Sequence, residues 1–213
     1  MTPSYLPASR YGGPIVSVHG LAKAQVEMGF EVDVCTTSVD GPSNSRVPHG
    51  VRVDLDGVGI YYFASKYFRR FYYSSHMGRY LSRIVKNYDI CHNHSIYLWP
   101  SWKASRLAKR SGVPVVISPR GMLVPELIAA RNSFIKSAWI RVVERRNFKR
   151  AAGIHFTSDL EADAARYYLP ASLKRQAIIP NGVESEAEIN HTPGFAKRDV
   201  ALYLGRINWK KNI

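Results

Sequence analysis

Several features are scarce or absent in this 213-residue sequence, and each absence narrows the class of protein. Only two cysteines occur, Cys35 and Cys91, in apolar, strand-like surroundings, so we expect buried free thiols in a reducing compartment. No run of about 18 apolar residues exists, which predicts that no helix spans a membrane. The first residues lack a basic stretch followed by an apolar one, so no signal peptide is predicted. Metal-ligand spacing is also missing, and we expect no metal.

Acidic residues are scarce as well. The sequence has 16 Asp and Glu against 30 Lys and Arg, which gives a formal net charge of +14. This excess indicates an anionic partner, for which nucleic acid, an anionic membrane face and phosphorylated substrates all qualify. Apolar residues make up 46% and charged residues 22%, as in ordinary globular proteins. The length allows one well-buried domain and the start of another.

Apolar, β-branched segments alternate with helical patterns along the chain. Helices are expected at 13–29, 72–86, 99–111 and 133–150, and strands at 31–36, 51–55, 58–63, 90–94, 115–118, 153–157 and 177–179. Ser158 to Glu161 forms a capping box that opens a further short helix, with the glutamate reaching back to the backbone. The alternation predicts an α/β fold, a parallel sheet with helices on both faces. Ligands of such sheets bind beyond the carboxyl ends of the strands.

A glycine loop, Tyr11-Gly12-Gly13-Pro14, directly precedes the first expected helix. Glycines let the backbone approach a ligand closely, and a helix N-terminus offers free amides to phosphate. Gly12 and Gly13 are therefore candidates for lining a binding cleft. An ordinary turn before a helix is the alternative.

Two expected strands end in polar side chains. His92 and His94 alternate along one strand, so both can point from the same face into one cleft; a structural hydrogen-bonded pair is the alternative. Zinc is not expected, because no third ligand lies at a familiar spacing. Arg120 stands beside Gly121 after the next strand, where an arginine suits an anionic substrate or is an ordinary surface residue.

A last motif follows the expected strand at 200–204. Arg206 and Lys211 lie in its strand-to-helix loop. Two such cations can neutralise a diphosphate leaving group, on which charge builds as a glycosidic bond breaks.

These motifs form an ordered set. They are the glycine loop, the His-x-His strand end, Pro119-Arg120-Gly121, Thr157-Ser158 with Glu161, Ile179 to Val183, and Leu204-Gly205-Arg206 with Lys211. The set resembles the family-4 glycosyltransferases, retaining enzymes of the GT-B fold, over nearly the whole chain. The resemblance implies an N-terminal, acceptor-side Rossmann-like domain at 1–182, a linker at 183–199, and the first strand and loop of a donor-binding domain at 200–213. It also implies that Arg206 and Lys211 hold the donor diphosphate, and that Gly12 and Gly13 line the cleft near the transferred sugar or the acceptor.

The sequence departs from the family pattern in three ways. Many members carry histidine, which touches the donor sugar, at the position of Arg120. The paired glutamates of the family, E-x7-E, do not occur before Ile213, and no apolar strand precedes Thr2. We therefore expect a chain truncated at both ends, in which ladder groups beside the missing first strand stay unpaired. Such a chain is expected to transfer no sugar by itself.

The expected long helix also carries a basic stripe. Arg141, Arg145 and Lys149 recur at four-residue spacing, and residues 61–80 are crowded with aromatics and cations. Such a surface suits an anionic bilayer, and the resemblance adds to this because many relatives use lipid-linked acceptors. A solvated helix face is the alternative.

Together these features predict a hexosyltransferase of cell-envelope polysaccharide synthesis. It transfers a hexose from a nucleoside-diphosphate sugar to a glycan or lipid-linked acceptor, with His92, His94 and Arg120 as catalytic residues. The nucleotide sugar is the co-substrate, no further cofactor is expected, and the location is the cytoplasm or, peripherally, the inner face of the plasma membrane. One alternative is another GT-B enzyme of the sucrose- or glycogen-synthase type. A basic nucleic-acid-binding protein is the other, but no zinc finger, aromatic RNA-binding signature or helix-turn-helix is evident, so no nucleic acid is expected as a partner.

Overall fold

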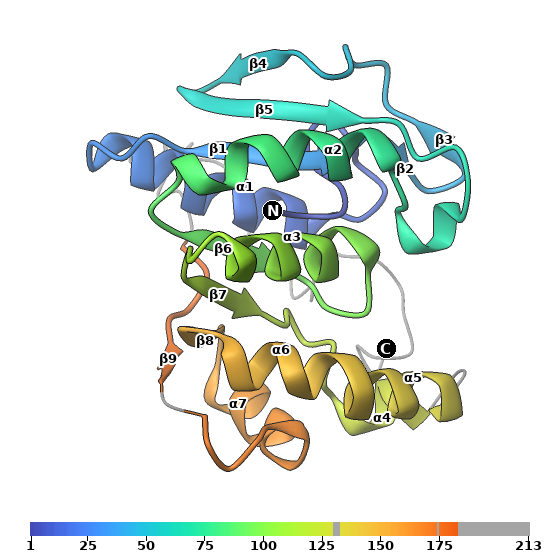
Figure 1. The fold of residues 1–213 in the computed structure, drawn as a ribbon, viewed down its shortest axis with the longest axis vertical. Coiled ribbons are helices and arrows are strands. Elements are labelled where there is room, and N and C mark those ends of the chain that lie inside the picture. Colours follow the sequence, from blue (N-terminus) through green and yellow to red (C-terminus); the bar gives the residue numbers. More distant parts are fainter. Residues whose placement is uncertain (130–132, 174, 183–213) are drawn as a thin grey trace, which may run out of the picture. The chain divides into compact units, whose positions relative to one another are not determined.

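Two groups of strands, with helices packed on them, make up the part of the chain that the structure describes (Figure 1). This computed structural model describes residues 1–129, 133–173 and 175–182. All of them belong to one unit, Met1–Val183. The expected linker and second domain, with Arg206 and Lys211, lie outside the described residues, so their arrangement and roles stay predictions.

The first group of strands has the order β1-β5-β4. Its members are β1 (Asp33–Thr37), β4 (Arg52–Leu55) and β5 (Val58–Phe63). Strand β1 runs parallel to β5, whereas β4 and β5, both expected as strands, form an antiparallel hairpin. Asp56 and Gly57 turn this hairpin with φ angles of 54° and 79°, the left-handed geometry that matches the twist of paired strands.

The second group is a parallel sheet of four strands in the order β6-β7-β8-β9. It consists of β6 (Cys91–His94), β7 (Val115–Ser118), β8 (Gly153–Phe156) and β9 (Gln176–Ile178). A short antiparallel pair that the sequence did not predict, β2 (Val39–Asp40) and β3 (Ser43–Asn44), follows β1.

The first four residues lie between β1 and β6. The Met1 ammonium group donates to the His92 carbonyl at 2.8 Å, and the His94 amide donates to the Met1 carbonyl at 2.9 Å. On the other side, the Thr2 amide donates to the Cys35 carbonyl at 3.3 Å. The expectation that ladder groups here stay unpaired is therefore wrong at the carboxyl ends of both strands, because residues 1–4 supply the partners.

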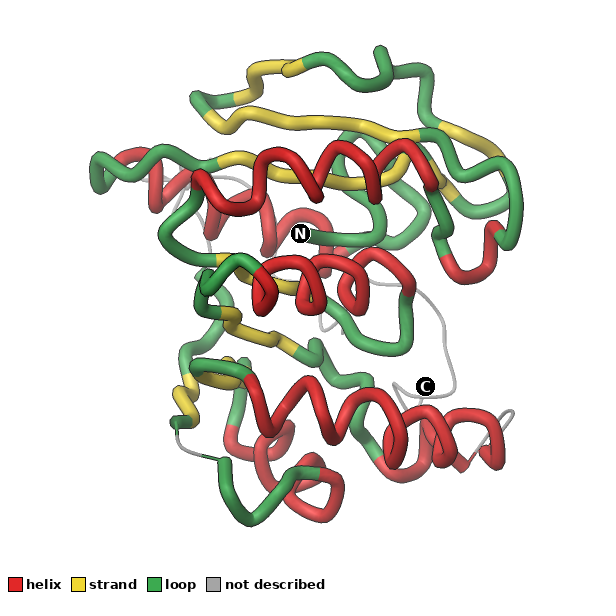
Figure 2. The backbone as a smooth tube through the Cα atoms, in the orientation of Figure 1, coloured by secondary structure: helices red, strands yellow, loops and turns green. Residues whose placement is uncertain are grey.

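Helices cover both faces of the strands (Figure 1). They are α1 (Gly13–Glu27), α2 (Ser75–Ile84), α3 (Trp99–Arg110), α4 (Pro125–Ala129), α5 (Ser133–Trp139), α6 (Arg145–Arg150) and α7 (Asp159–Ala165). Figure 2 shows the helices, in red, against the strands, in yellow. No described helix combines the length and the apolar character that crossing a membrane requires.

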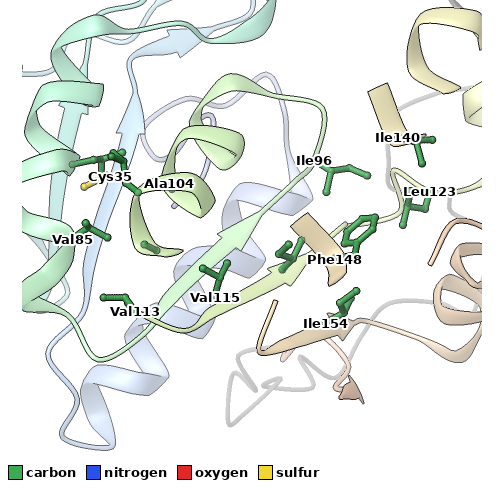
Figure 3. Close-up of a cluster of buried hydrophobic side chains, with 14 of the residues drawn as sticks. Cys35, Val85, Ile96, Ala104, Val113, Val115, Leu123, Ile140, Phe148 and Ile154 are labelled. Atoms are coloured by element: carbon green, nitrogen blue, oxygen red, sulfur yellow. The ribbon is translucent and has the colours of Figure 1, made fainter. Parts of the chain in front are cut away.

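The buried side chains form two cores, because successive residues of a strand point to opposite faces. Cys35 belongs to the core that includes residues of α2, α3 and α6, whereas Val34 belongs to the core that includes residues of α1. Figure 3 shows the first core, in which Val115 and Ile154 of the second sheet gather with Phe148 of α6. Cys35 and Cys91 are free thiols, as predicted, but only Cys35 is fully buried, whereas Cys91 is partly exposed; burial raises the pKa of Cys35 to about 12.

The predicted helix at 133–150 is interrupted by a π-helical turn, Ile140–Glu144, between α5 and α6. Glu144 ends this turn, and its buried carboxylate accepts through Oε1 from the Tyr97 amide at 3.0 Å and from Trp139 Nε1 at 2.8 Å. The fold otherwise matches the expected parallel sheet with helices on both faces.

Candidate functional site

The candidate site lies at the carboxyl ends of β6, β7 and β8. His94 ends β6 and is in register with Ser118, which ends β7. The His92 and His94 ring centroids are 4.1 Å apart, so the two rings share one face, as their alternation predicted. Parallel strands therefore bring together side chains that are 24 or more residues apart in the sequence.

A chain of hydrogen bonds runs across the three strands. His92 Nε2 lies 2.7 Å from Ser118 Oγ, which lies 2.9 Å from His155 Nδ1, and His155 Nε2 lies 2.9 Å from the Ile179 carbonyl. A carbonyl only accepts, so His155 must donate from Nε2. When both imidazole rings are neutral, His155 Nδ1 then accepts from the Ser118 hydroxyl, and His92 Nε2 donates to the Ser118 oxygen. The tautomer of each ring is thus inferred from its partner.

The two predicted histidines are held in their neutral forms. Burial lowers the pKa of His92 to about 3, and the Met1 ammonium group and the neighbouring His155 and Arg120 side chains act in the same direction. Burial likewise lowers the pKa of His94 well below its ordinary value. Neutral imidazoles can donate or accept hydrogen bonds at neutral pH, but they cannot supply a positive charge.

Arg120 supplies a positively charged side chain to the site. Its Nε and Nη2 donate to Nδ1 of His94 at 3.3 and 3.1 Å, and its Nη1 donates to Oδ1 of Asn181. Burial lowers the Arg120 pKa, but an arginine remains a cation at any pH at which the protein folds. In the described part of the chain no carboxylate forms an ion pair with Arg120. The arrangement therefore offers a partly buried cation to an anionic ligand.

Glu161 holds the loop that carries Arg120. The Ser158 hydroxyl accepts from the Glu161 amide at 3.2 Å, as the capping box predicted. The carboxylate does not return to Ser158: Oε2 accepts from the amide and hydroxyl of Thr157, each at 2.8 Å, and Oε1 accepts from the Gly121 amide at 2.6 Å. The side chain is buried. The glutamate therefore reaches back to the backbone as predicted, but to the amide of Thr157, one residue before the N-cap, and it also accepts from the Gly121 amide.

The glycine loop lies at the start of α1. Gly12 has φ 62° and ψ −133°, a conformation that essentially only glycine adopts. A Cβ atom added to Gly13 would have no described heavy atom within 4 Å, so the backbone there is open. No hydrogen bond or ring contact within the described ranges joins this loop to the cluster around Arg120. Whether Gly12 and Gly13 share a cleft with that cluster stays a prediction.

The sequence did not single out Ser118, His155 or Asn181 as site residues. Ser118 ends β7, His155 lies in the last half of β8, and Asn181 follows β9 within the 179–183 motif, so their places near the carboxyl edge of the sheet were the available signal. No group of three or more His, Cys, Asp or Glu side chains that could hold a metal ion occurs among the residues that the structure describes.

Comparisons with known proteins define the family. The family model of the glycosyl transferase 4-like domain matches residues 12–182. Sucrose-phosphate synthase from Thermosynechococcus elongatus is a solved structure of similar fold, with a TM-score of 0.54 and 15% sequence identity over 79% of this chain and 42% of that chain. A comparison with curated proteins gives no match.

The similarity to the synthase concerns the fold alone at this identity, and it confirms the predicted α/β, Rossmann-like architecture of a GT-B domain. This chain spans less than half of the length of that structure. The family model, in contrast, covers most of the chain and reaches from the glycine loop to the Asn181 segment. The chain therefore belongs to the glycosyl transferase 4-like family.

Proposed function

We propose that this chain takes part in the transfer of a hexose from a nucleoside-diphosphate sugar to a glycan or lipid-linked acceptor in cell-envelope polysaccharide synthesis. Family membership and the GT-B fold support the reaction class. The observation that carries the proposal is Arg120, a cation without a carboxylate partner in the described part, held at the carboxyl edge of the sheet.

The proposed role of Arg120 is to stabilise the negative charge of the leaving phosphate. When the glycosidic bond of the donor breaks, negative charge builds on the leaving phosphate, and a fixed cation in a partly buried site stabilises it. Arg206 and Lys211 are proposed to hold the remaining charge of the diphosphate. The proposed mechanism uses these cations in place of a metal ion.

His94 and His92 have different proposed roles. Because Nδ1 of His94 accepts from Arg120, its proton is on Nε2, which can donate to a hydroxyl of the transferred sugar or the acceptor. His92 donates to Ser118 and is proposed to fix the position of the neighbouring His94 ring. Gly12 and Gly13 are proposed to leave room for the sugar, which the open backbone at Gly13 supports.

A membrane location is part of the proposal. Tyr67, Phe68 and Phe71 are exposed by 73%, 74% and 51%, and Lys66 and Arg70 stand beside them. Exposed aromatic side chains flanked by cations favour the interface of an anionic bilayer. We therefore propose that the protein works on the inner face of the plasma membrane, where a lipid-linked acceptor is within reach.

Ligand-dependent thermal unfolding tests the reaction class. We expect nucleoside-diphosphate hexoses to raise the Tm of the 213-residue chain, whereas duplex DNA gives no sequence-dependent binding. A sequence-dependent DNA affinity without any effect of nucleotide sugars would support the nucleic-acid alternative instead. A soluble sugar acceptor that binds better than a lipid-linked one would favour the synthase-type alternative.

A further inference from the structure

A second charged feature lies at the amino end of β7, the opposite end from Arg120 and His94. A cavity of about 660 Å³ opens there between α3, the loop 112–115 and the helix that ends in α6. Helices α3 and α6 pack against each other on one face of the sheet (Figure 1). The cavity is therefore separate from the candidate site described above.

Five cationic side chains line this cavity, and no carboxylate does. They are Arg106, Lys109, Arg110, Arg146 and Arg150. None of them forms an ion pair or a side-chain hydrogen bond with another described residue. Five positive charges around one cavity repel one another and destabilise the folded state unless an anion binds there.

Helix dipoles account for only part of this cluster. Lys109 and Arg110 stand in the last turn of α3, and Arg150 stands in the last turn of α6, where cations stabilise a helix C-terminus. Arg106 and Arg146 stand outside these last turns. An anionic ligand bound in the cavity would account for the position of all five cations.

The side chains fit one chemical class of ligand. Four of the five cations are arginines, whose planar forks donate two parallel hydrogen bonds to phosphate oxygens. The Arg106 guanidinium lies 5.5 Å from the Trp102 ring centroid, which restrains its position. Trp102, Val142 and Val143 add an apolar wall. We propose that this cavity binds a phosphate-bearing ligand, either a small phosphate compound or the headgroup of an anionic lipid, independently of the proposed glycosyl transfer.

The test uses two neighbouring pairs on one helix. Arg146 and Arg150 line the cavity, whereas Arg145 and Lys149 do not, so R146E/R150E and R145E/K149E change the net charge equally. Binding of inorganic pyrophosphate and of a soluble short-chain phosphatidic acid to the full chain is measured by isothermal titration calorimetry. We expect R146E/R150E to weaken binding by about tenfold or more, and R145E/K149E by less than about threefold.

The better of the two ligands identifies the source of the phosphate: pyrophosphate indicates a soluble compound, and phosphatidic acid indicates a lipid headgroup. Equal losses in both variants would overturn the proposal, because they would show a diffuse charge effect rather than a site. The proposal would also be overturned if neither ligand binds the wild-type chain at millimolar ligand concentrations. Circular dichroism checks the fold, and if R146E/R150E does not fold, R106Q/K109Q replaces it with the same expected loss.

Discussion

The Arg120 guanidinium donates from both Nε and Nη2 to Nδ1 of His94, although 26 residues separate the two in the sequence. An arginine has no acceptor, so this contact requires that His94 leave Nδ1 unprotonated. The pair therefore combines a permanent cation with a neutral imidazole whose proton is on Nε2. Charge stabilisation and hydrogen-bond donation are thereby assigned to two adjacent side chains, and several outcomes follow from that division.

The buried histidines should make stability depend on pH. Folding lowers the pKa of His92 to about 3 and that of His94 well below its ordinary value, so the unfolded state binds more protons below about pH 6.5. The free energy of unfolding is then at its full value above about pH 6.5. It falls as the pH drops from there toward 3, by up to about 1.4 kcal/mol per pH unit for each histidine.

Urea denaturation between pH 4.5 and 7.5 measures this slope. We expect H92Q to reduce it, because one titrating group is removed, and H76Q, which replaces an exposed histidine, to leave it unchanged. A wild-type slope that H92Q does not alter would contradict the buried, neutral state of His92.

Replacing Glu161 by glutamine should loosen the loop that carries Arg120. The amide nitrogen of glutamine would face a donor, either the Gly121 amide or the Thr157 groups, so one set of hydrogen bonds is lost. We expect E161Q to lower the free energy of unfolding by about 2 kcal/mol and to speed hydrogen exchange at the Gly121 amide. The matched control is D163N on the same helix, whose exposed carboxylate pairs with the exposed Arg166; this variant should change the free energy of unfolding by less than about 0.5 kcal/mol. Unchanged exchange at Gly121 in E161Q would show that the carboxylate does not restrain the loop.

The two glycines of the loop before α1 should respond differently to alanine. Gly12 occupies a positive φ, so G12A is expected to cost about 1–3 kcal/mol of unfolding free energy. Gly13 is the first residue of α1 and open, so G13A should change stability by less than about 1 kcal/mol. If Gly13 lines the sugar cleft, G13A will still weaken binding of the nucleotide sugar. Equal stability losses in the two variants would be inconsistent with the loop geometry.

The exposed aromatic loop should drive membrane binding. Serine at positions 68 and 71 removes apolar area that would enter the bilayer interface, so F68S/F71S should reduce sedimentation with anionic vesicles by at least about fivefold. The control Y167S removes an equally accessible aromatic, exposed by 90%, from another part of the surface and should bind as wild type does. Added salt should weaken the binding of all three proteins. If the wild-type protein does not sediment with anionic vesicles even at low salt, the proposed membrane location is wrong.

The sequence predicted the site where local periodicity decides geometry. Alternation along one strand was enough to put His92 and His94 on one face, and the three-residue spacing of Ser158 and Glu161 predicted the helix cap. The partners of these residues were beyond prediction, because they depend on which strands become neighbours. His155 reaches Ser118 only through the β7–β8 pairing, and the Glu161 carboxylate meets Gly121 across 40 residues.

The same limit applies to the fold. The sequence pattern at 133–150 is helical throughout and does not predict the π-helical turn. The turn ends at Glu144, whose buried carboxylate accepts from the Tyr97 amide 47 residues earlier, a contact that no local pattern predicts. The pairing of residues 1–4 with β1 and β6 was missed for a similar reason. A stretch of four residues is too short to show a strand periodicity of its own.

The most direct test of the proposed function is whether a donor sugar binds at Arg120. Saturation-transfer NMR on the chain with a panel of nucleoside-diphosphate hexoses reports which ligand protons contact the protein. The proposed function predicts saturation of the hexose protons of at least one donor, loss of that signal in R120A, and its retention in R166A, which removes an exposed arginine from the surface. No saturation from any donor, or an equal signal in R120A, would contradict it.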